Sequence, residues 1–243
     1  MEAARGKRLL DEVEEMTLKE VLDNLRLALT PSVRTKPTHL AELDAVAARH
    51  YRDTQAATLA LTGRSLPLVY KVVSTLVSAP WRYAVLVVDV EGYFDESRLT
   101  CADEEDLAHV YVQRAGNDDD DDDGDTQEGD DDEDDDTDTD AVRNLVVAAQ
   151  RFMLYDAVAS ASRHWWGTVV VGGSGPGSLA GLPVDVVAGR KGWLHIEREA
   201  VPPFPPGLTI DEALAQREAR QKVVDAAGWV ATSPWGGFVF HEG

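Results

Sequence analysis

The sequence lacks most features that mark secreted, metal-binding or membrane-spanning proteins. Its 243 residues include one cysteine, Cys101, which excludes an intramolecular disulfide framework and a cysteine-based zinc cluster. Residues 1–10 mix acidic and basic side chains with no apolar core after them, so no secretory signal is expected. The strongest apolar run, Tyr83–Val90, contains Asp89 and is far shorter than the roughly 20 residues of a membrane span. We therefore expect a soluble protein of a reducing compartment with no membrane partner.

Basic side chains are scarce as well, and most of the excess negative charge lies in one segment. The chain has 44 acidic and 23 basic side chains and a net charge of −21. Between Asp118 and Asp140 there are 17 acidic residues and no Lys or Arg, which leaves only −4 for the rest of the chain. A nearly pure Asp segment repels itself and buries nothing, so residues 117–140 are predicted to form a disordered acidic loop. Its negative charge argues against tight independent DNA binding by this chain. The alternative to a solvated loop is a binding tail for basic partners such as histones.

Helical spacing of apolar residues predicts a short N-terminal helical segment over residues 1–52. The apolar positions of residues 8–29 recur at helical intervals, and a second helix is predicted from Thr38 to about Tyr51. This segment is either a small helical appendage or the opening layer of the main domain.

From residue 53 onward, predicted strands alternate with predicted helices. Strands are expected at 58–62, 83–90, 109–113, 168–171, 193–197, 229–232 and 238–240. Helices are expected at 66–77, from 142 to about 155, and between a capping box at Thr209 and Glu212 and a stop at Gly228. This alternation predicts an α/β core domain over 53–243, built on a doubly wound, mostly parallel sheet.

One stretch carries a more specific motif. The predicted strand ends in Asp89-Val90-Glu91-Gly92-Tyr93-Phe94, the pattern D-x-E-G-x-F, and Arg98-Leu99 follow three residues later. This resembles the segment after the Walker A helix in eukaryotic RecA-family recombinases and their paralogues. Residues 165–173 and 228–233 resemble two later strands of that family, so the resemblance covers roughly residues 55–243 and implies a RecA-like core.

The nucleotide-binding elements depart from the family pattern. A phosphate loop needs G-x-x-x-x-G-K-[ST], and the corresponding Thr58–Ser65 keeps only Gly63-Arg64-Ser65. Arg is a poor replacement for the compact ammonium of Lys. The strand expected to supply a metal-holding Asp runs from Val171 into two glycines instead.

The resemblance implies roles for the two carboxylates of the motif. It makes Glu91 the general base that polarises the attacking water, here vestigial because the phosphate clamp is degraded. Asp89 joins Gly63, Arg64 and Ser65 as a vestigial nucleotide-binding residue. The alternative is structural: Asp89 and Glu91 end a strand, and an ion pair with Arg98 holds the following turn. No cofactor is required on this interpretation, and weak binding of ATP with Mg²⁺ is left open.

Other candidate features point to structure rather than chemistry. The glycine-rich residues 172–177 lie far from the first strand with no clear helix after them, so a flexible loop is favoured over a dinucleotide site. The six histidines are scattered and predict no metal site. The tryptophans are interpreted as packing or partner residues, with stacking on single-stranded DNA as the alternative; they include Trp165, Trp166, Trp193, Trp229 and Trp235.

The resemblance implies a nuclear, non-catalytic subunit that scaffolds a recombinase-paralogue complex in homologous recombination repair of double-strand breaks. Its partners would be other paralogues, the recombinase, and single-stranded or branched DNA reached through the complex. Within the family it is most similar to a small paralogue that lacks a separate large N-terminal domain. One alternative is a DNA-dependent ATPase with a divergent nucleotide site. The other is a methyltransferase-like enzyme that uses Asp89 or Glu91 on a ribose, which would require a glycine-rich loop after the first strand.

Overall fold

The computed structural model describes residues 35–101, 103–115, 134–201, 214 and 217–242 of the chain. Three sequence predictions lie outside these ranges: the helix within 8–29, most of the acidic loop, and the capping box at Thr209 and Glu212. The described residues belong to a structural unit that begins at Thr35 rather than at residue 53. The predicted second helix is therefore the opening layer of the main domain.

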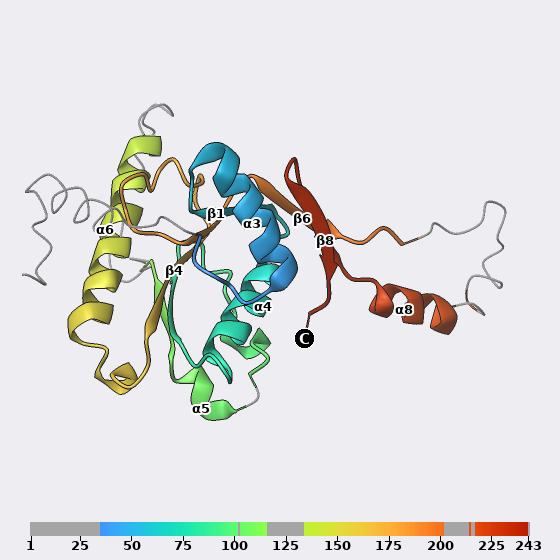
Figure 1. Ribbon diagram of the computed structural model, residues 1–243, viewed down its shortest axis with the longest axis horizontal. Helices are drawn as coiled ribbons and strands as arrows, with labels where there is room; N and C mark the ends of the chain where they lie inside the picture. Colours follow the sequence, from blue (N-terminus) through green and yellow to red (C-terminus); the bar gives the residue numbers. More distant parts are fainter. Residues whose placement is uncertain (1–34, 102, 116–133, 202–213, 215–216, 243) are drawn as a thin grey trace, which may run out of the picture. The chain divides into compact units, whose positions relative to one another are not determined.

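Eight strands of the described residues form a single mixed sheet, in the order β3-β2-β4-β5-β1-β6-β7-β8 (Figure 1). They are β1 Leu59–Gly63, β2 Ala84–Asp89, β3 Val110–Arg114, β4 Trp165–Val171, β5 Val186–Ala188, β6 Leu194–Arg198, β7 Trp229–Ser233 and β8 Gly236–Phe240. The first six pair in parallel, and β6-β7-β8 pair antiparallel. The predicted α/β class with a mostly parallel sheet is confirmed, and the architecture is compatible with a Rossmann or a RecA-like fold.

Helices cover both faces of the parallel part of the sheet. The helices are α3 Ala41–Thr54, α4 Leu66–Val77, α5 Glu104–Leu107, α6 Asp134–Tyr155 and α8 Arg217–Ala226, with short 3₁₀ turns at Glu96–Arg98 and Val158–Ser160. Figure 1 shows α6 on one side of the strands and α3 and α4 on the other. Helices on both faces explain why β2 is buried along its whole length.

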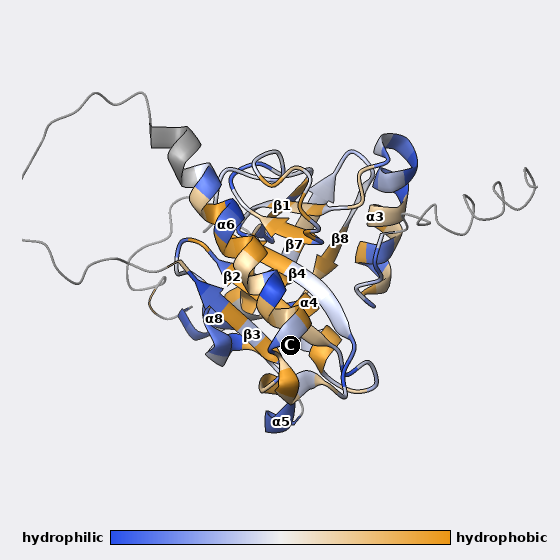
Figure 2. Ribbon diagram, turned by 90° about the vertical axis from the view of Figure 1, so that its left-hand side faces the viewer, coloured by the Kyte–Doolittle hydropathy of each residue, from blue (hydrophilic) through white to orange (hydrophobic). Residues whose placement is uncertain are grey.

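Alternate residues of β2 enter two separate cores. Val85 and Val87 of β2 pack with residues of α3 and α4, whereas Leu86 and Val88 pack with α6. Figure 2 shows β2 and β7 as largely hydrophobic strands, with hydrophobic and hydrophilic residues mixed along α6. The arrangement along β2 is the period-two alternation expected of a strand that has a helix layer on each side.

Several parts of the fold differ from the sequence prediction. Helix α3 spans Ala41–Thr54 rather than 38 to about 51, and the short helix α5 was not predicted. Helix α6 begins at Asp134, so residues 134–140, predicted to belong to the disordered acidic loop, are helical. Acidic residues are favoured near a helix N-terminus because the macrodipole is positive there, and the apolar second half of α6 packs on the sheet. Strand β5 was not predicted, because three residues are too few to show a period.

Candidate functional site

The junction between β1 and α4 contains the residues predicted to bind phosphate. β1 extends through Gly63 and α4 starts at Leu66, so only Arg64 and Ser65 connect them. Residues 59–61 pair with β5 on one side, and residues 61–63 pair with β6 on the other. The stretch expected to match a phosphate loop is therefore mostly a central strand, whose amides are used by the sheet.

Local packing accounts for each residue of this turn. Gly63 has a positive φ of 77°, and a Cβ there would lie 2.4 Å from the carbonyl oxygen of Ile196, so only glycine fits. The backbone N–H of Arg64 donates to that same oxygen at 2.8 Å. Ser65 is buried, and its carbonyl accepts hydrogen bonds from the first turn of α4. Pro67, at the N-terminus of α4, has no N–H to offer a ligand.

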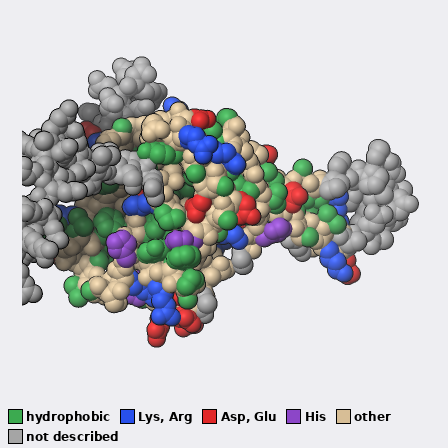
Figure 3. Space-filling model, viewed as in Figure 1, with side chains coloured by type: hydrophobic (Ala, Val, Ile, Leu, Met, Phe, Trp, Pro, Cys, Tyr) green, Lys and Arg blue, Asp and Glu red, His purple; other side chains and the backbone are tan. Residues whose placement is uncertain are grey.

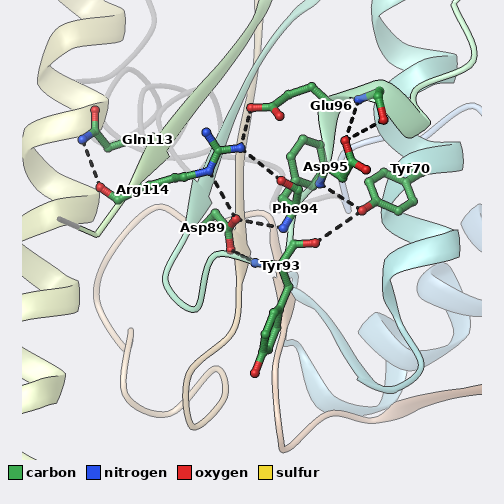
Figure 4. Close-up of polar contacts among 9 residues, drawn as sticks. Tyr70, Asp89, Tyr93, Phe94, Asp95, Glu96, Gln113 and Arg114 are labelled. Carbon is green, nitrogen blue, oxygen red and sulfur yellow. Dashed lines mark hydrogen bonds and ion pairs between the residues drawn. The ribbon is translucent and has the colours of Figure 1, made fainter. Parts of the chain in front are cut away.

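Asp89 holds the turn after β2 (Figure 4). Its side chain is fully buried, and its two carboxylate oxygens accept hydrogen bonds from the backbone N–H groups of Tyr93 (3.1 Å) and Phe94 (2.8 Å). Arg114 Nε lies 3.8 Å from the same carboxylate, while Arg114 Nη2 donates to Glu96 Oε1 at 2.7 Å. This geometry agrees with the structural interpretation of Asp89.

Tyr70 fixes the far end of the same turn. Its hydroxyl accepts from the N–H of Asp95 at 3.1 Å and lies 3.5 Å from the carbonyl oxygen of Tyr93. Asp95 in turn caps the following 3₁₀ turn, and hydrogen bonds from the side chain and N–H of Ser97 hold the pKa of Asp95 below its usual range. Tyr70 and Asp89 together set the path of the chain that carries Glu91.

Glu91 lies on the exposed side of this turn and contacts the end of β4. Its Oε1 accepts a hydrogen bond from the N–H of Gly173 at 3.0 Å, and a Cβ on Gly172 would come within 2.8 Å of its Cγ. The sequence indicated no carboxylate at the end of β4, and Val171 is indeed followed by this glycine pair. Within the described residues, no group of three or more His, Cys, Asp or Glu side chains is placed to hold a metal ion.

The carboxyl ends of β1, β2, β4 and β5 surround a cavity of about 650 Å³. Gly63, Arg64 and Ser65 line it from one side and Glu91 from another, so four of the five predicted site residues meet there. A second cavity of about 760 Å³ lies on the α6 side and shares Glu91 with the first. Ligands of open α/β sheets bind at this edge, in the crevice outside the strand ends.

The first of these two cavities, of about 650 Å³, also has lining residues whose contacts or positions the sequence did not predict. Arg98 was expected to pair near Asp89 and Glu91, but its Nη2 lies 2.7 Å from Oε2 of Glu242. Arg190 and Trp229 also line the cavity. Arg190 follows β5, and Trp229 is the first residue of β7. The positions of these strands in the sheet depend on contacts distant in sequence, so no local sequence pattern predicts that the two residues line the cavity.

Four of the six tryptophans make packing contacts with the rest of the described structure, whereas Trp81 is 43% exposed. The indole N–H groups of Trp166, Trp193 and Trp235 donate to Pro37 O, Thr58 O and Asp53 Oδ2, respectively. Trp229 is buried beneath Arg198, whose guanidinium lies 5.1 Å from its ring. These side chains connect α3 and its neighbouring turns to the sheet, as the packing interpretation requires.

Comparisons of the chain with protein-family models, with curated proteins and with solved structures return no match. Among the helices that the structure describes, none is both long and apolar enough to cross a membrane.

Proposed function

We propose that this chain is a non-hydrolysing, RecA-like subunit of a recombinase-paralogue complex, most like the small X-ray-repair cross-complementing paralogue. Its function is homologous recombination repair of DNA double-strand breaks in the nucleus. Its role is architectural: it docks other paralogues and assists recombinase filaments on single-stranded DNA.

Three elements named by the resemblance support the RecA-like assignment by their position. The β1–α4 turn, the motif residue Glu91 and the end of β4 come from separate parts of the chain and meet at one cavity. β2 and β4 are neighbours in register, so Asp89 lies opposite Val171. A strand–turn–helix unit, here β1, Arg64-Ser65 and α4, lies beside the carboxylate of Glu91. This is the arrangement expected of a nucleotide-binding core that has lost parts of its site.

The observation that carries the proposal is the β-ladder over Leu59–Gly63. A phosphate cradle requires several free backbone N–H groups in a loop between strand and helix. Here the corresponding residues pair with β5 and β6, and Arg64 N–H bonds to Ile196 O. Binding a triphosphate in the family's manner would break this part of the sheet.

The same observation argues against both alternatives. A DNA-dependent ATPase would need the β1 amides to leave the sheet when nucleotide binds. A methyltransferase-like enzyme would need a glycine-rich loop after β1, where a two-residue turn is found.

The test is co-purification with recombinase paralogues and rescue of radiation survival in cells that lack this protein. We expect Glu91→Gln and Ser65→Ala to assemble and rescue as the unchanged chain does, because neither nucleotide hydrolysis nor metal binding is needed. Failure of the unchanged chain to bind any paralogue would refute the proposal. Loss of rescue in Glu91→Gln, with assembly intact, would favour the ATPase alternative.

A further inference from the structure

The 650 Å³ cavity beside the β1–α4 turn is lined by arginines and by two carboxylates of the chain itself. Arg64, Arg98 and Arg190 line it, together with Glu91 and Glu242. Arg98 pairs with Glu242 at 2.7 Å, and its guanidinium also lies over the ring of Tyr70, 5.3 Å from the centroid. The position of Glu242 shows that a carboxylate fits against Arg98.

We propose that this cavity is a docking site for an acidic segment of a partner protein, whose carboxylate replaces Glu242 on Arg98 and reaches Arg64 or Arg190. The inference rests on the proposed function, since it identifies a surface through which the subunit docks. It also accounts for Arg64: a guanidinium that is poorly shaped for a phosphate loop suits a carboxylate well.

The available donors favour a carboxylate over a polyphosphate. The backbone amides of β1 belong to the sheet, and Pro67 removes a donor from the start of α4. Three guanidinium groups line the cavity, together with two carboxylates. A guanidinium binds a carboxylate through two parallel N–H···O bonds and needs no backbone cradle. In the described residues, Arg64 and Arg190 have no side-chain ion pair or hydrogen bond.

The apolar part of the cavity specifies the rest of the occupant. Leu66, Val171, Ala188 and Trp229 line it beside the charged groups. Of the chain's own residues, Phe240 is buried opposite Trp229 in the sheet, and Glu242, two positions later, contacts Arg98. The partner segment should therefore carry an apolar side chain close to its carboxylates.

The segment that carries Glu242 is held by two contacts that a partner can replace. One is the Arg98 ion pair, whose side chains are 50% and 36% exposed. The other is the hydrogen bond from Lys71 Nζ to the carbonyl oxygen of His241, at 2.8 Å. Pairs this exposed contribute little to stability, so a competing carboxylate can displace Glu242 at small cost.

The experiment uses fluorescence polarisation of the full chain with a short fluorescein-labelled peptide of glutamates flanking a phenylalanine. Arg64→Gln and Arg190→Gln should each weaken binding by about tenfold, as expected for losing a hydrogen bond to a charged group. Arg151→Gln, an exposed residue of α6 that does not line the cavity, is the matched control for net charge and should leave binding unchanged. Glu242→Gln should strengthen binding because it removes the competing carboxylate.

Failure of the full chain to bind the peptide would overturn the inference. So would equal effects of the three arginine variants, or equal binding of a peptide with glutamine in place of glutamate. Two further contrary results are displacement by tripolyphosphate at lower concentration than by unlabelled peptide, and binding only after deletion of residues 117–133. The last result would make the chain's own acidic segment the occupant. If the peptide fails to bind and ATP also fails, docking uses another surface and the proposed function stands. Tight ATP binding, by contrast, contradicts the proposed function itself.

Discussion

At the scale of single residues, the two carboxylates of the D-x-E-G-x-F motif have separate tasks. Asp89 turns inward and binds the amides of its own turn, whereas Glu91 turns outward and contacts Gly173 after β4. The sequence placed both at the end of a buried strand, because an unbroken β-branched run is recognisable locally. It could not assign the inward and outward directions, which depend on where the chain bends after Val90.

Asp89→Ala should lower the free energy of unfolding by about 3 kcal/mol, because it leaves the N–H groups of Tyr93 and Phe94 without an acceptor and Arg114 without its buried partner. Urea denaturation measures the change. Glu96→Ala is the control: it removes an exposed partner of the same arginine and should cost below about 1 kcal/mol. Equal losses in the two variants would show that Asp89 is not structural.

His50 should make the protein less stable in mild acid. The ring is buried between Trp193 and Trp235, and its Nδ1 has no hydrogen-bond partner in the described structure. Burial lowers the pKa of His50 below its ordinary 6.5, although the backbone of Ala56 and the charge of Asp53 oppose the shift.

The unfolded chain therefore takes up a proton at a higher pH than the folded chain does. The free energy of unfolding should fall as the pH drops through 6.5, by up to about 1.4 kcal/mol per pH unit for this group. Denaturation between about pH 7.5 and 5.5 tests this, because His50→Gln should flatten the profile. The exposed His195→Gln is the control, and identical slopes in both variants would contradict the assignment.

At the scale of elements, local patterns predicted those parts of the fold whose signal is local. The bounds of α4 are those expected from its apolar spacing and its early proline, and β2, β6 and β7 lie within one residue of their predicted positions at each end. β5 and the start of α6 were missed, because a three-residue strand and an acidic helix start have no distinctive period. The Arg98–Glu242 pair spans 144 residues and leaves no local trace.

Gly63→Ala and Gly92→Ala distinguish two physical requirements for glycine: a left-handed backbone conformation and a close approach of neighbouring atoms. Both positions have positive φ, but a Cβ at Gly92 meets nothing within 4 Å, whereas one at Gly63 meets β6. Gly92→Ala should cost about 1–2 kcal/mol for the left-handed backbone alone. Gly63→Ala should cost about 2 kcal/mol more, because its methyl group overpacks the β1–β6 contact. Thermal denaturation measures both, and equal losses would refute the close approach of β1 and β6.

At the scale of the whole molecule, charge distribution limits what the chain does alone. Its net charge is −21, and most of it lies in the segment between Asp118 and Asp140. On the face shown in Figure 3, basic and acidic side chains are interspersed and form no continuous basic stripe. A protein that follows a nucleic-acid backbone needs such a stripe, and the face drawn in Figure 3 does not supply one.

The isolated chain should therefore bind single-stranded DNA no more tightly than about 100 μM at physiological salt, the weak end of non-specific binding. Fluorescence anisotropy with a labelled oligonucleotide measures this. The variant that lacks residues 117–133 is the control for repulsion by the acidic segment. Micromolar binding by the full chain would show that a DNA-binding surface is present on the subunit itself.

β1 and its two-residue turn occupy the place where the resemblance expects a phosphate cradle, and the proposed function requires that they bind no nucleotide. Isothermal calorimetry of the full chain with Mg²⁺ and ATP tests this requirement most directly, alongside Glu91→Gln. We predict no binding up to millimolar nucleotide for either protein. Micromolar binding, with hydrolysis lost in Glu91→Gln, would mean that the amides of β1 leave the sheet to hold phosphate, and the chain would be an ATPase.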